Sequence, residues 1–201
     1  MNTSLEKDLG VLISDDLEWN NHVNCAVNKA NQKLGQIKHV FHYMNEIMMK
    51  MLFVSLVRPH LEYAATIWNP YWQYDKDKLE KVQQRATRID SLRGYSYEER
   101  LKKLDLLSLE NIRRRGDLIQ MFKYFKGYDI INFYRPPEII DNERKTRGHN
   151  LKLRRQLTTN MKRFNFFTNR VVNDWNDLEQ DAIDTSSVNQ FKNKIDKNFK
   201  Y

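Results

Sequence analysis

Residues 55–88 read SLVRPHLEYAATIWNPYWQYDKDKLEKVQQRATR, and the second half of this stretch has a clear helical period. From Asp75 onward, apolar residues recur at steps of three, four and three: Leu79, Val82, Ala86 and Ile89. This spacing places them on one side of a helix that extends to Leu92. Each is preceded by a cation, which creates a parallel basic stripe of Lys78, Lys81, Arg85 and Arg88. We expect the apolar side to be buried and the stripe to face solvent.

The first half of the stretch belongs to a helix that Asn45 can cap and that Pro59 kinks or restarts. Apolar residues occur on almost all sides of this helix, which predicts that it is the most buried one. Asn69-Pro70 ends the following helix, which carries Leu61, Ala64, Ala65 and Trp68.

The flanking sequence predicts mostly helices. A short strand at Leu9–Ser14 precedes a helix from Asn20 to about Tyr43. Later helices are expected at residues 97–104, 108–127, 169–178 and 187–199, with a small β-hairpin between 150–157 and 161–167. The predicted fold class is mainly α, a helical bundle with a short N-terminal strand and that hairpin.

Composition narrows the function classes. The chain has 201 residues, a net charge of +8 and one cysteine, Cys25, and its mean hydropathy is −0.78. The single cysteine allows no internal disulfide and suits a reducing compartment. Neither a membrane-spanning run nor a signal peptide is evident. We therefore expect an intracellular location, nuclear or cytoplasmic, with no membrane partner and no small-molecule substrate.

The positive charge is concentrated in residues 144–173, which carry nine Lys or Arg and no Asp or Glu. A segment of one sign favours a polyanionic partner, although a basic surface over a hairpin is the simpler alternative. Phe164, Phe166 and Phe167 alternate with these cations and suit either base contacts or a core. Arg113-Arg114-Arg115 cannot all share one side of a helix, so we expect one to pair with Glu110 or Asp117.

The order of these blocks resembles reverse transcriptases of non-LTR (LINE-type) retrotransposons, in the region just after the polymerase palm. That family writes SLVRP-LEYA-xxW-PY followed by DxxKLEKVQRRA-R. Further similar blocks are SYEERL at 96–101, SLENIRRRGDLIQMFKYFKG at 108–127, TRGHNLK at 146–152 and FFTNRVVNDWN at 166–176. Two departures, Glu179 in place of Pro and Asp90 in place of an apolar residue, put activity in doubt more than fold.

The resemblance implies three regions: a remnant of the palm-edge hairpin at 1–18, a thumb-like helical bundle at 19–92, and a C-terminal helical region at 93–201. It implies a non-catalytic segment that grips template–primer duplex (RNA/DNA) and that belongs beside the palm and fingers of a parent polymerase, here truncated. The candidate nucleic-acid-binding residues are Lys78, Lys81, Arg85, Arg88, Arg114, Arg147, Lys152, Arg154, Arg155, Lys162, Arg163 and Arg170. An inert retroelement remnant and a helical protein-interaction module remain as alternatives.

Two patterns imitate metal sites. Asp15-Asp16 resembles the paired aspartates of a polymerase, but its context, LGVLISDDLEWNNH, is that of a turn followed by a helix. His22, Cys25, His39 and His42 have zinc-finger-like spacing, yet on one helix the two pairs would lie about 25 Å apart. We therefore assign no catalytic residue, metal or cofactor. The four tryptophans are interpreted as core residues, with base stacking by Trp72 as the alternative.

Overall fold

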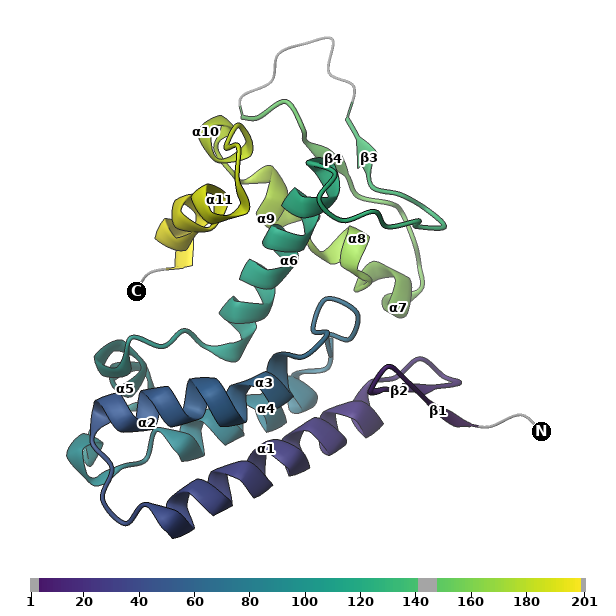
Figure 1. The fold of residues 1–201 in the computed structure, drawn as a ribbon. Helices are drawn as coiled ribbons and strands as arrows, with labels where there is room; N and C mark the ends of the chain where they lie inside the picture. Colours follow the sequence, from purple (N-terminus) through teal and green to yellow (C-terminus); the bar gives the residue numbers. More distant parts are fainter. Residues whose placement is uncertain (1–3, 141–147, 200–201) are drawn as a thin grey trace. The chain divides into compact units, whose positions relative to one another are not determined.

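The computed structural model describes residues 4–140 and 148–199, and it is mainly helical with two small antiparallel strand pairs. The predicted fold class is therefore confirmed (Figure 1). The chain divides into two compact units between Ile112 and Arg113, inside helix α6 (Leu109–Phe125). This division falls later than the predicted boundary after residue 92, because the residues up to Leu109 pack into the first core.

The first unit begins with a hairpin of β1 (Leu5–Asp8) and β2 (Val11–Ser14). The predicted strand is shorter than expected, because Leu9 and Gly10 form the connecting turn with φ of 43° and 90°. Two positive φ values suit a tight two-residue turn, and glycine adopts one of them without strain.

Two long helices, α1 (Asn20–Val40) and α4 (Gln73–Ala86), pack against each other. Asn24 contacts Lys78, and seven residues further along each helix Asn31 contacts Arg85, which shows that the two helices run parallel. The apolar side of α4 is buried as predicted: Leu79, Val82, Ala86 and Ile89. The helix itself is shorter than expected, since Ile89 follows its end and a 3-10 turn, η2 (Asp90–Leu92), replaces its last part.

In the sequence, these helices are connected by a helical run of α2 (Glu46–Leu52), the π-helical η1 (Phe53–Val57) and α3 (Arg58–Glu62), which packs against α1. Asn45 caps it as predicted, accepting from the Met48 amide at 2.8 Å. The π-helical segment η1 ends two residues before Pro59, and proline has no backbone N–H to donate to a helical hydrogen bond. Because a π turn holds more residues than an α turn, it keeps apolar residues at steps of four on one side: Met49, Phe53, Val57 and Leu61.

The prediction that this run is the most buried helix was wrong. Ile47, Met51 and Val54 are exposed by 72%, 65% and 39%, and Leu56 is also exposed. The run packs through one side only, and its other apolar side is left on the surface.

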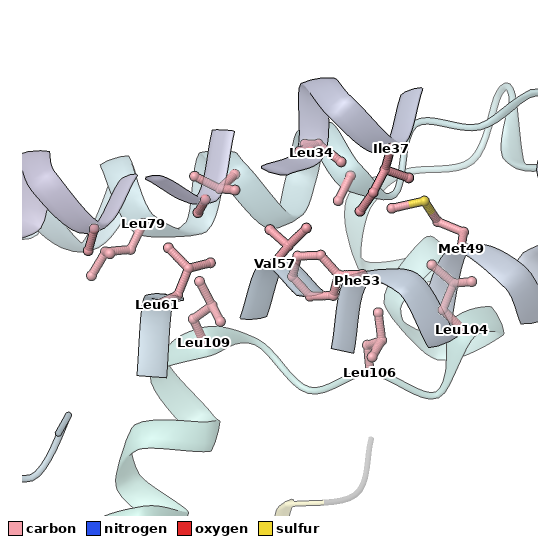
Figure 2. Packing of buried hydrophobic residues seen from close by; sticks show 14 of the residues in the cluster. Leu34, Ile37, Met49, Phe53, Val57, Leu61, Leu79, Leu104, Leu106 and Leu109 are labelled. Carbon is pink, nitrogen blue, oxygen red and sulfur yellow. The ribbon is translucent and has the colours of Figure 1, made fainter. Parts of the chain in front are cut away.

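Helix α5 (Tyr97–Leu104) begins with a capping box between Ser96 and Glu99. Together with the start of α6, it closes the first core. Figure 2 shows Leu106 below Phe53, Leu109 below Leu61, and Leu104 next to Met49.

The second unit contains the rest of α6 and a series of short elements, whose bounds are β3 (Glu138–Ile139), β4 (Leu153–Arg154), α7 (Met161–Phe164), α8 (Phe167–Arg170), α9 (Val172–Asn176), α10 (Gln180–Ile183), α11 (Val188–Ile195) and η3 (Asp196–Phe199). Its core is aromatic. Phe122 stacks on Phe191 with ring centroids 4.2 Å apart, and Phe125 stacks on the fully buried Trp175 at 5.5 Å.

The strand near residue 150 exists, but its predicted partner was wrong. β4 pairs with β3, whereas residues 161–164 form α7. Asn160 explains the difference, since its side chain accepts from the amides of Lys162 and Arg163 and so starts a helix. Likewise, the helix expected at 169–178 is broken into α8 and α9.

Candidate nucleic-acid interface

The basic stripe of α4 lies beside α1, and its partners there are neutral amides. Lys78 Nζ donates to Asn24 Oδ1 at 3.1 Å, and Arg85 Nη1 donates to Asn31 Oδ1 at 2.7 Å. Asparagine oxygens orient a cation without cancelling its charge. The contacts with α1 therefore orient Lys78 and Arg85 without supplying a negative charge.

Lys38 extends this row and was missed by sequence reasoning. Its Nζ donates to the Arg85 carbonyl oxygen at 2.9 Å, at the C-terminal end of α4. Burial lowers the pKa of Lys38, and the nearby charges of Arg85 and Arg88 lower it further. The seven-residue step Asn24, Asn31, Lys38 was the available signal, but it has meaning only once α1 and α4 are known to be parallel.

The stripe contains one ion pair. Lys78 lies 3.1 Å from the buried carboxylate of Asp75 and over the ring of Tyr74. Lys81, Arg85 and Arg88 are exposed, as predicted, and within residues 4–140 and 148–199 none of them pairs with a carboxylate. We call Lys38, Lys81, Arg85 and Arg88 the α4 basic row.

Two of the candidate cations in the second unit are held in bidentate ion pairs. Arg114 donates to Asp174 at 2.8 and 2.6 Å, and Arg170 donates to Asp117 at 2.7 and 2.8 Å. Of the three consecutive arginines, Arg115 pairs with Asp196, and the charge of Arg113 acts on Asp117, one of the two carboxylates expected as a partner. Arg114 and Arg170 thus have structural partners that a phosphate would have to displace.

The Arg170–Asp117 pair is the more buried of the two, with side chains exposed by 12% and 6%. Burial raises the pKa of the Asp117 carboxyl, an effect that Arg170 and then Arg113 oppose. Removing either partner would leave a buried charge without its bidentate partner. Through this buried pair, Arg170 of α8 is fixed to Asp117 of α6.

Three arginines of residues 144–173, Arg154, Arg155 and Arg163, have different surroundings from Arg170. Arg154 is exposed on β4. The guanidinium of Arg155 lies over Phe164 at 4.9 Å, and that of Arg163 lies over Phe166 at 5.2 Å. Arg163 also donates to Gln156. In the part of the chain that the structure describes, no carboxylate pairs with these three arginines.

Three of the predicted nucleic-acid-binding residues remain. Lys152 and Lys162 are half-buried. Arg147 lies outside the described residues.

One residue from each of the two metal-like patterns, Asp16 and His22, takes part in hydrogen bonds that support the local fold. Asp16 accepts from Ser14 Oγ at 2.5 Å and from the Glu18 amide at 2.9 Å, which forms the turn after β2. His22 is buried against Trp68, and its Nδ1 accepts from the Leu12 amide at 3.1 Å. Among the described residues, no three His, Cys, Asp or Glu side chains gather into a metal site.

The expectation that the tryptophans are core residues is confirmed for Trp68 and Trp175 and was wrong for Trp72. Trp68 and Trp175 are completely buried, whereas Trp72 is exposed by 48%. Its neighbour Tyr71 donates to Glu18 at 2.5 Å, and burial together with this bond raises the pKa of Tyr71 to about 12.

Comparison with known protein families, curated proteins and solved structures finds no match to this chain. Over the described residues, no helix combines the length and apolar character that crossing a bilayer requires.

Proposed function

We propose that the chain is a non-catalytic nucleic-acid-binding segment of a non-LTR reverse transcriptase, comprising the thumb and the region after it. In this role it grips a template–primer duplex through basic helix faces, beside the palm and fingers of the parent polymerase. Its place is inside the cell, in the nucleus or cytoplasm, where such a duplex forms. The family rests on the sequence resemblance alone.

The α4 basic row is the observation that carries the binding function. Within the row, Asn31 orients Arg85 and a carbonyl at the end of α4 orients Lys38, and burial and repulsion disfavour the charged form of Lys38. A phosphate placed there would relieve the repulsion among these cations. A row of phosphate contacts positions a protein on a duplex without reading its sequence.

Binding to a labelled RNA/DNA duplex tests the proposal. We expect Arg85→Gln with Arg88→Gln to weaken binding at least tenfold at low salt. The matched control is Lys29→Gln with Lys33→Gln, which removes the same charge from exposed positions of α1. Equal effects of the two double variants would mean that net charge, and not the row, governs binding.

One observation favours the alternative of a helical protein-interaction module. Ile47, Met51 and Val54 recur at four- and three-residue steps and are exposed, so they form an apolar strip on one side of a helix. Exposed apolar surface of this kind commonly marks a protein contact. An inert remnant would use neither surface.

A further inference from the structure

Residues 153–170 place two arginine–phenylalanine pairs next to each other. Phe164 ends α7 and Phe166 immediately precedes α8, so only Asn165 separates the two rings in sequence. They are exposed by 37% and 40%, whereas the adjacent Phe167 is exposed by 4% and belongs to the core. The fold therefore buries one phenylalanine of the three and leaves two at the surface.

The backbone that carries these rings is held by one buried side chain. Asn169 is completely buried. Its Oδ1 accepts from the Gln156 amide at 3.1 Å, and its Nδ2 donates to the carbonyl oxygens of Gln156 and Arg163 at 3.3 and 3.2 Å. These bonds join the segment after β4 to the end of α7. The two rings are thus supported by a fixed framework.

Each ring has a guanidinium over it and no carboxylate paired with that guanidinium in the described chain. Arg155 lies over Phe164, and its Nε is buried without a hydrogen-bond partner. Arg163 lies over Phe166 and donates to the neutral Gln156. Both guanidinium groups keep their positive charge beside an aromatic surface.

We infer that Phe164 and Phe166 form a stacking platform for unpaired bases, with Arg154, Arg155 and Arg163 contacting the phosphates of the same strand. This inference rests on the proposed nucleic-acid-binding function and names a substrate class for this segment, a single strand. Alternating aromatic rings and cations suit single strands, because each base offers a flat face and each linkage one phosphate. In a duplex the base faces are covered by neighbouring pairs, so these rings would gain little from it.

The test compares three labelled probes of equal length: oligothymidylate, a strand of abasic residues with the same phosphates, and a mixed-sequence duplex. We expect the full chain to bind oligothymidylate about tenfold more tightly than the abasic strand, the size expected for one stacked base. Phe164→Leu with Phe166→Leu should abolish this difference, while Phe164→Tyr with Phe166→Tyr should preserve it. Tyr43→Leu, at an exposed aromatic of the first unit, is the control and should change nothing.

A second measurement uses the unmodified chain. With 2-aminopurine as one base of the strand, stacking on a phenylalanine ring should lower its fluorescence on binding. Equal affinity for the oligothymidylate and abasic strands, or unchanged 2-aminopurine fluorescence, would overturn the inference while leaving phosphate binding intact. Failure of all three probes to bind at low salt would refute the proposed function and this inference with it.

Discussion

Val82 on α4 provides a quantitative test of the packing that presents the basic row. Val82 is exposed by 1%, so Val82→Asp removes a buried apolar side chain and introduces a carboxylate without a partner. Losing the burial costs about 1.5–3 kcal/mol, and burying an unsatisfied polar group costs about 1–3 kcal/mol more. We expect a loss of about 3–5 kcal/mol in the free energy of unfolding, a large share of the about 5–15 kcal/mol typical of proteins.

Urea unfolding followed by tryptophan fluorescence measures this loss, because Trp19, Trp68 and Trp72 all lie in the first unit. With a slope of about 1–3 kcal/mol per molar urea, the midpoint should fall by at least about 1 M. Val82→Ala separates the lost packing from the buried charge. Lys81→Ala, at an exposed position one residue away, should change stability by less than about 0.5 kcal/mol. If Lys81→Ala is the more damaging change, the assigned register of α4 is wrong.

Three further results are expected. Primer extension with Mg²⁺ or Mn²⁺ should give no product, and extension that disappears in Asp15→Asn would overturn the non-catalytic role. Arg170→Met should destabilise the second unit by about 3–5 kcal/mol, because it removes the bidentate partner of the buried Asp117 carboxylate. A loss of unfolding free energy below about 1 kcal/mol in chemical denaturation would argue against a buried pair. Burial lowers the pKa of His149, whose ring contacts the Trp175 carbonyl oxygen at 2.8 Å, so the neutral form stabilises the fold. That stability should be complete above about pH 6.5 and decline as the pH falls below it, and His149→Gln should remove this part of the pH dependence of thermal unfolding.

Periodicity predicted the elements that rest on local pattern. The apolar side of α4 and the Asn45 cap both follow from residue type and spacing within one helix. Helix ends were less predictable. The apolar spacing continues to Ile89, yet α4 ends at Ala86. Ile89 is buried although its backbone lies beyond the helix, so a buried apolar residue at helical spacing does not prove that the helix continues.

The partners of the cations could not be predicted, because they lie far apart in sequence. Asn24 and Lys78 are separated by 54 residues, and Asp117 and Arg170 by 53. Only the packing of whole helices decides which cation meets an amide and which meets a carboxylate. A count of positive residues therefore could not show that Arg114 and Arg170 are held in ion pairs, or that Lys38 lies at the end of α4.

The salt dependence of nucleic-acid binding tests the central claim most directly. Neutralising about five phosphates should make log K fall with log[salt] with a slope near −4. Arg154→Ala with Arg155→Ala should flatten that slope by about one to two units and weaken binding to all sequences alike. Fluorescence anisotropy at several salt concentrations gives both values. Absence of binding at low salt, or a slope that the double substitution leaves unchanged, would contradict binding through these phosphate contacts.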